Sequence, residues 1–110
     1  MDGRGVEKNE CEAVAWYRKA ADQGYAPAQF KVGFCYAVGR GVEKNERETI
    51  EWFRKAAEQG YAPAQSEVGF CYAVGHGVEK NEREAVAWYR KAAEQGYAPA
   101  KSKLAELGLL

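Results

Sequence analysis

The sequence predicts an all-α solenoid of antiparallel helix pairs, and three observations lead to this fold class. The pentapeptide GYAPA occurs three times at an interval of 36 residues. Residues 5–40 and 41–76 are identical at 27 of 36 positions. Each period holds two segments of helical periodicity separated by glycine and proline. Because such a repeat buries its apolar side only by stacking on neighbours, we expect one domain over residues 1–110. Its repeats are 5–40, 41–76 and a partial 77–110 that ends in a capping helix.

The longer segment of each repeat predicts a capped amphipathic helix. In the central copy Asn45 precedes ERETIEWFRKAAEQG and Glu48 follows three residues later, a variant of the capping box. One side of the helix is charged, with i, i+4 pairs, and the other carries apolar residues at spacings of three and four: Ile50, Phe53, Ala56 and Ala57. We expect these helices at about residues 10–23, 46–59 and 82–95.

The repeated segment QGYAP predicts a tight corner between two helices. Gly60 lacks a Cβ and can adopt the left-handed conformation that ends a helix, and Pro63 has the fixed φ of a helical first turn. The second helix is ended by the glycines of GRG or GHG, and a loop returns the chain. We expect these second helices at about residues 27–38, 63–74 and 99–107.

Composition and charge exclude several classes of partner. Lys plus Arg is 16 and Asp plus Glu is 16, so no net field attracts the chain to nucleic acid. The sequence has no apolar signal region and no run that could span a bilayer, so we expect no membrane partner. The localisation stays unknown, with the cytoplasm as the default.

No constellation of residues predicts catalysis, a metal or a cofactor. His76 is the only histidine, and it occupies the loop position of Arg40 in the preceding repeat. A lone imidazole makes neither a zinc site nor a catalytic dyad. The segment GRGVEKN follows a helix and lacks the spacing of a phosphate-binding loop. We expect a chain that is not an enzyme and has no cofactor.

Cysteine and tryptophan recur in ways that favour structural roles. Cys35 and Cys71 are equivalent, and successive repeats lie about 9–10 Å apart by ordinary helix spacing, too far for a disulfide. We expect both to be buried reduced thiols. Arginine replaces Cys11 in the other repeats, so an exposed thiol capable of intermolecular crosslinking is expected there. A ladder that stacks bases or sugars and core packing are both open for Trp16, Trp52 and Trp88, and packing is favoured.

The segment AQFKVGFCYAVGRGVEKNERETIEWFRKAAEQGYAP resembles the Sel-one-like repeat (SLR), a relative of the tetratricopeptide repeat. The resemblance covers residues 5–104 and implies a right-handed α-solenoid (α/α superhelix) that serves as a scaffold for other proteins. At the C-terminus Ala105 and Glu106 replace Gly33 and Phe34, which resembles a more polar capping helix. The resemblance rests on Ala28, Val32, Gly33, Tyr36, Gly39, Gly41, Val42, Trp52, Ala56, Ala57 and Gly60.

In the tetratricopeptide-like architecture that this resemblance implies, the first helix of each repeat lines the concave face. Apolar surface there indicates an interaction site for a peptide or protein with hydrophobic anchors. One alternative is that Phe34 and Phe70 belong to the core between helices. Another is a structural array without a dedicated ligand, which self-associates weakly end to end or through Cys11. The expected partner-binding residues are Phe30, Phe34, Val38, Ser66, Phe70 and Val74.

Overall fold

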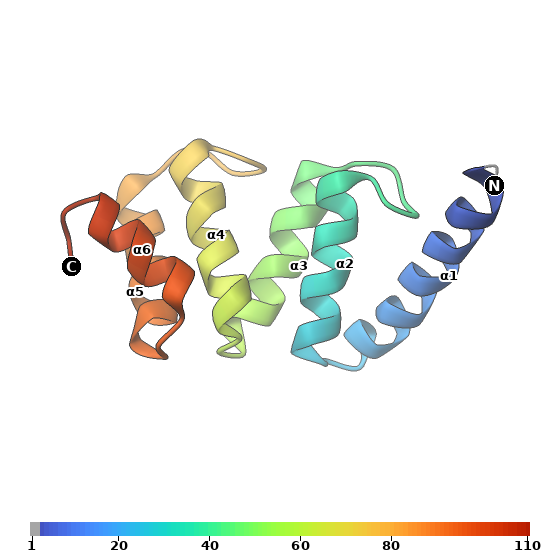
Figure 1. Ribbon diagram of the computed structural model, residues 1–110, viewed down its shortest axis with the longest axis horizontal. Helices are drawn as coiled ribbons and strands as arrows, with labels where there is room; N and C mark the ends of the chain where they lie inside the picture. Colours follow the sequence, from blue (N-terminus) through green and yellow to red (C-terminus); the bar gives the residue numbers. More distant parts are fainter. Residues whose placement is uncertain (1–2) are drawn as a thin grey trace.

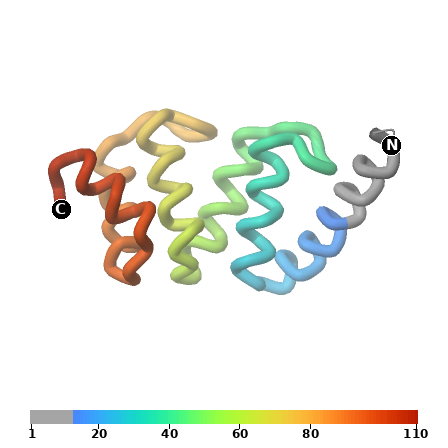
Figure 2. The backbone as a smooth tube through the Cα atoms, in the orientation of Figure 1, coloured from blue at the N-terminus to red at the C-terminus, as the bar shows by residue number. Residues whose placement is uncertain are grey.

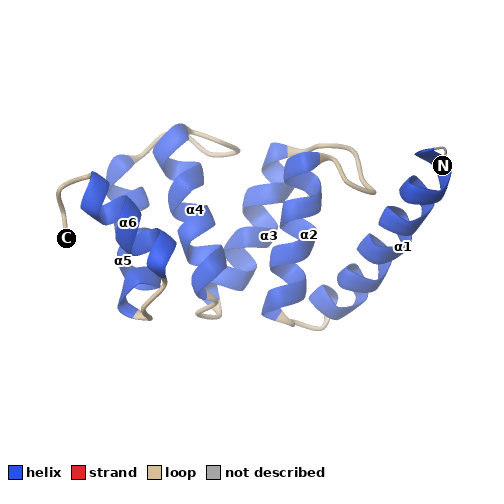
Figure 3. Cartoon of the chain, viewed as in Figure 1, coloured by secondary structure: helices blue, strands red, loops and turns tan. Residues whose placement is uncertain are grey.

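The chain folds into six helices joined by short loops. The computed structural model describes the backbone of residues 3–110 and the side chains of residues 13–110. This part of the chain contains no strand (Figure 3), which confirms the all-α prediction. The helices are α1 (Gly3–Asp22), α2 (Ala26–Val38), α3 (Glu46–Glu58), α4 (Ala62–Val74), α5 (Glu82–Glu94) and α6 (Ala98–Glu106).

The helices stack in chain order into an elongated row. Each helix contacts the next, and contacts are most extensive between α2 and α3 and between α4 and α5. The described chain measures 47 × 25 × 25 Å, with α1 at one end and α6 at the other (Figures 1 and 2). The buried apolar residues form three clusters along the row, each bridging adjacent helices. This open stack of antiparallel pairs confirms the predicted solenoid.

The corner between α3 and α4 has the predicted glycine conformation. Gly60 has a φ of +92° and its N–H donates to the carbonyl of Ala57 at 3.0 Å. The N–H of Tyr61 donates to the carbonyl of Ala56 at 3.2 Å, and Pro63 lies in the first turn of α4. These bonds use carbonyls that the helix end would leave free. Local sequence therefore fixes the reversal of chain direction.

Side-chain caps start α3 and α5. The Asn45 side chain accepts a hydrogen bond from the N–H of Glu48 at 3.0 Å, and Asn81 accepts one from Glu84 at 3.1 Å. Each asparagine has the extended backbone of an N-cap, so it satisfies one of the free N–H groups of the first turn. The predicted asparagine caps are thus confirmed. The reciprocal bond of the capping box is not formed, because the N–H of Asn45 donates to the carbonyl of Tyr36 at 3.0 Å instead.

Close contact between paired helices requires glycine on α4. A Cβ on Gly69 would lie 2.9 Å from the Tyr89 ring and 3.1 Å from the carbonyl oxygen of Ala85, both on α5. Real side chains do not approach so closely without displacement. The missing Cβ therefore sets how near α4 and α5 can come to each other.

Helix α1 begins earlier than the sequence predicts. The octapeptide GRGVEKNE belongs to α1 at residues 3–10, yet the same octapeptide at 39–46 ends α2, makes a loop and starts α3. In the next copy the loop rests on the preceding repeat, where a Cβ on Gly77 would overlap the carbonyl oxygen of Glu46. The predicted start near residue 10 is therefore wrong, because the same octapeptide adopts both conformations and local sequence alone does not decide between them.

Candidate functional site

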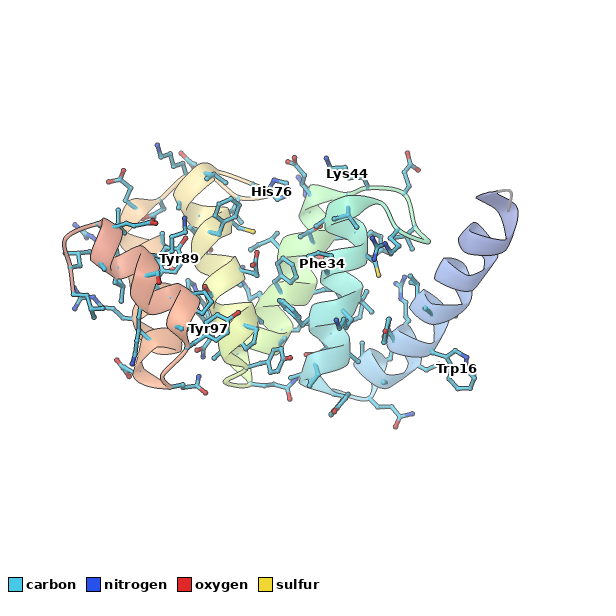
Figure 4. All side chains as sticks on the ribbon, in the orientation of Figure 1. Trp16, Phe34, Lys44, His76, Tyr89 and Tyr97 are labelled. Atoms are coloured by element: carbon cyan, nitrogen blue, oxygen red, sulfur yellow. The ribbon has the colours of Figure 1, made fainter. Side chains whose placement is uncertain are left out.

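An open pocket lies between α2 and α4, with α3 beneath it. Its volume is about 170 Å³ and its walls are mainly apolar. We name it the inter-repeat pocket, because its two sides come from equivalent helices of successive repeats. Phe34 and His76, labelled in Figure 4, come from α2 and from the loop after α4. The lining residues are Phe34, Ala37, Thr49, Phe53, Glu67, Phe70, Cys71 and His76.

Four of the predicted partner-binding residues are exposed along α2 and α4. Phe34 is 45% exposed and Phe70 is 44% exposed, and both line the inter-repeat pocket. Val38 and Val74, at the C-terminal ends of the same helices, are also exposed. These four side chains are therefore solvent-exposed, and Phe34 and Phe70 also contribute part of their surface to the pocket walls.

Phe30 and Ser66, in contrast, are less exposed, since Phe30 is partly buried and Ser66 is buried. The Phe30 ring lies 5.3 Å from the Phe53 ring and 5.6 Å from the Tyr61 ring, measured between centroids. Ser66 is buried at the equivalent position of α4. Ser66 is therefore not available to a partner, and Phe30 keeps only part of its surface exposed beside the Tyr61 and Phe53 rings. The tyrosine in every GYAPA corner was the signal for this contact.

Glu67 is a half-buried carboxylate on the wall of the inter-repeat pocket. Within residues 13–110 it has neither an ion pair nor a hydrogen-bond donor. Burial raises the pKa of the Glu67 carboxyl above its ordinary value of 4.5. The cause is desolvation, which disfavours the charged form of a carboxyl group.

Cys71 lies one helical turn after Glu67. Burial raises the pKa of its thiol to about 12, and the carboxylates of Glu67 and Glu46 add to this effect. Cys35 and Cys71 are both buried, as predicted, and Cys71 is a free thiol. A neutral, shielded thiol contributes apolar wall to the pocket, not a nucleophile.

The loop after α4 closes one side of the inter-repeat pocket. The Nδ1 atom of His76 lies 3.4 Å from the Oε1 atom of Glu46, at the start of α3. Within the described side chains, no three His, Cys, Asp or Glu residues cluster as metal ligands. The contact between His76 and Glu46 therefore positions the loop. The pocket itself offers a ligand apolar walls and one carboxylate.

Sequence reasoning missed a chain of glutamines that connects consecutive repeats. Gln29 and Gln65 are buried, and each donates to a carbonyl of the preceding longer helix, Ala21 or Ala57, at 3.2 Å. Their own side-chain oxygens accept hydrogen bonds from the glutamines at the next corner, at 2.8 and 2.9 Å. The signal was the recurrence of PAQ and EQG in successive copies. These glutamines stabilise the stack and lie apart from the pocket.

The tryptophans differ although their sequence positions are equivalent. Trp52 is 5% exposed and belongs to an apolar cluster formed by α1, α2 and α3, with the Arg18 guanidinium 5.7 Å from its ring centre. Trp16 is 71% exposed and projects away from the other helices (Figure 4). The packing interpretation is thus confirmed for Trp52, while Trp16 has no covering helix. The side chain of Cys11 lies outside the described residues.

Comparison with known proteins identifies the repeat. A family model described as the Sel1 repeat matches residues 1–25, 26–61 and 62–97. A search of curated protein sequences finds no match. None of the helices in the described part of the chain has the length and apolarity needed to cross a membrane.

Solved structures of similar proteins have the same fold. A protective antigen of uropathogenic Escherichia coli that displays an SLR fold matches with a TM-score of 0.84 and 42% identity, over 86% of this chain and 20% of the antigen. A Sel1 repeat protein from Oxalobacter formigenes matches with a TM-score of 0.77 and 48% identity, over 79% of this chain and 35% of that protein.

A third match is cysteine rich protein B of Helicobacter pylori, with a TM-score of 0.79 and 26% identity over 83% of this chain and 68% of that protein. The present chain thus spans less than half the length of the first two relatives. Three family matches in register, together with the six-helix stack, give one conclusion. The chain belongs to the Sel1 repeat family.

Proposed function

We propose that the chain is a non-enzymatic protein-interaction module that binds a peptide or protein segment along α2 and α4. The observation that carries this proposal is the pair of equivalent phenylalanines, Phe34 and Phe70, which stay almost half exposed beside the inter-repeat pocket. Exposed apolar side chains gathered around a concavity are typical of interaction sites. The balanced charge of the chain favours neither nucleic acid nor membrane as the partner.

Peptide selection followed by site mapping tests this function. Peptides would be selected from a random displayed library on the immobilised chain, and their affinities measured by fluorescence anisotropy. We expect the double variant Phe34→Glu, Phe70→Glu to lose at least about tenfold in affinity, because each charge would replace an apolar contact. Leu110→Glu changes an exposed apolar residue elsewhere and serves as the control. Unchanged binding by the double variant, with its helical circular dichroism intact, would overturn the proposal.

Self-association is the second candidate, and the exposure of Trp16 favours it. Trp52 at the equivalent position is covered by α1 and α2, whereas Trp16 is 71% exposed. A second copy of the chain could bury this face. Light scattering across protein concentrations, with and without reductant, tests the idea. A monomer at every concentration eliminates it, and a dimer that Trp16→Glu dissociates supports it.

A further inference from the structure

The two most similar repeats differ in sequence at the inter-repeat pocket. Residues 5–40 and 41–76 differ at nine positions, and four of these differences fall on lining residues. Two of the four, Glu67 and His76, are ionisable. Glu67 stands where the first repeat has Lys31, and His76 stands where it has Arg40. The C-terminal helix has Lys103 at the position of Glu67. This pocket alone therefore has a carboxylate at that position of the short helices.

The negative charge of Glu67 is not neutralised by any counter-ion within the described part of the protein. It is half-buried against the walls formed by Phe34 and Phe70, and no described cation or donor pairs with it. His76 is the only lining residue that can be cationic, and it is paired with Glu46. A desolvated carboxylate without a counter-ion is unfavourable, so a cation that enters the pocket gains both the charge interaction and the apolar contact.

The pocket walls suit the stem of a basic side chain. Arginine and lysine have an apolar stem and a charged head, and they stack on aromatic rings. The chain uses this arrangement internally, since Lys55 lies 4.4 Å from the Trp52 ring centre and Lys91 lies 4.4 Å from the Trp88 ring centre. Phe34 and Phe70 offer two further rings with no cation over them within the described residues.

We propose that the inter-repeat pocket takes an arginine or lysine side chain of the partner, with Glu67 as its counter-ion and Phe34 and Phe70 against its stem. This inference rests on the proposed function, because it names the chemistry of the partner at the same site. It makes the expected partner a basic segment with flanking apolar residues.

A titration with single amino-acid probes tests the inference. N-acetyl-arginine methylamide and its neutral isostere N-acetyl-citrulline methylamide would be added to 15N-labelled protein and followed by NMR. We expect saturable chemical-shift changes at the amides of Glu67, Phe70 and His76. The arginine probe should bind about fivefold more tightly than the citrulline probe, which is the gain expected from a partly exposed ion pair. Glu67→Gln should abolish the difference, whereas Glu94→Gln, an exposed residue of α5, should preserve it.

Each outcome separates this inference from the proposed function. Equal binding of both probes at the pocket, or no saturable shifts there, overturns the assignment of a cation site. Loss of peptide capture in the Phe34 and Phe70 variant would still support the interaction module in that case. An arginine preference that survives Glu67→Gln also overturns the role given to this carboxylate.

Discussion

The ring of Phe53 occupies the space that a side chain at position 33 would need. A Cβ on Gly33 would lie 2.7 Å from the Cδ1 atom of Phe53 and 3.2 Å from the carbonyl oxygen of Thr49. Phe53 is itself buried and stacks with Phe30, so it has little freedom to move aside. The pairing of α2 with α3 therefore depends on the absence of a side chain at Gly33.

Replacement of Gly33 by alanine should destabilise the fold despite the better helix propensity of alanine. We expect Gly33→Ala to lower the free energy of unfolding by about 1–3 kcal/mol, as overpacking of a core does. Urea unfolding followed by circular dichroism measures this change. In a Phe53→Leu background the same substitution should cost less, because the ring is gone. An equal cost in both backgrounds would show that the contact is not the reason.

Truncation of equivalent tryptophans should have very different effects. We expect Trp52→Ala to cost about 3–5 kcal/mol, since Trp52 fills the contact of α3 with α1 and α2. Trp16→Ala should change stability by no more than about 0.5 kcal/mol, because Trp16 is exposed. Denaturant unfolding of the two variants makes the comparison, and each serves as the control of the other. Similar costs would contradict the assigned packing.

Loss of a buried glutamine should weaken the connection between repeats. Gln65→Leu leaves the carbonyl of Ala57 without its side-chain donor and removes the acceptor of Gln95. We expect a loss of about 1–3 kcal/mol in unfolding free energy, because two hydrogen bonds worth about 0.5–1.5 kcal/mol each are removed. Gln23→Leu, at an exposed corner position, is the matched control and should be close to neutral. A neutral effect of Gln65→Leu would disprove the structural role of this glutamine.

The carboxylate of Glu67 should make stability depend on pH. Because the folded pKa lies above the ordinary value of 4.5, the native state holds this proton more tightly than the unfolded state. The contribution of Glu67 to stability therefore falls as pH rises from 4.5 through the folded pKa. Glu67→Gln should be more stable than the wild type at neutral pH, and the difference should vanish below pH 4.5.

Urea unfolding of both proteins between pH 4 and pH 7 measures this difference. The comparison isolates Glu67, since both proteins keep the other titratable groups of the surroundings. A difference that grows as pH falls would contradict the direction of the pKa shift. The shared groups are Glu46, Cys71, His76, Tyr89 and Tyr97.

Cys71 should resist alkylation in the folded protein. With a thiol pKa of about 12 and a buried side chain, almost no thiolate is accessible at pH 8. Iodoacetamide should therefore label Cys71 only as fast as the structure opens, and in urea it should label the residue rapidly. Peptide mapping by mass spectrometry measures both rates. Rapid labelling of Cys71 under native conditions would contradict its buried position.

Most of the fold could be predicted because its signals are local and repeated. Gly60 in its left-handed conformation, Pro63 in the first turn and the Asn45 cap each act on neighbouring residues only. Each signal occurs in successive copies, so the helix boundaries follow directly. The start of α1 could not be predicted, because the same octapeptide is helical at residues 3–10 and contains a loop at residues 39–46.

The candidate site was predicted in part, and the reason lies in long-range packing. Phe30 and Phe34 lie one turn apart on α2, and helical periodicity assigns them to one face. Tyr61 from the following corner covers part of Phe30 and leaves Phe34 exposed, which no local pattern reports. The position of Glu67 on the wall of the inter-repeat pocket could not be predicted either, because residues from three helices and a loop form these walls.

The glycine contacts of the paired helices also bear on how the chain finds its native arrangement. Gly33 meets a phenylalanine and Gly69 meets a tyrosine, and these two rings differ by one hydroxyl group. An out-of-register partner, including the corresponding helix of another molecule during concentrated refolding, meets nearly the same surface as the correct one. Because successive repeats are so similar, we expect domain swapping, the exchange of helices between chains, to be the characteristic misfolding event of this protein.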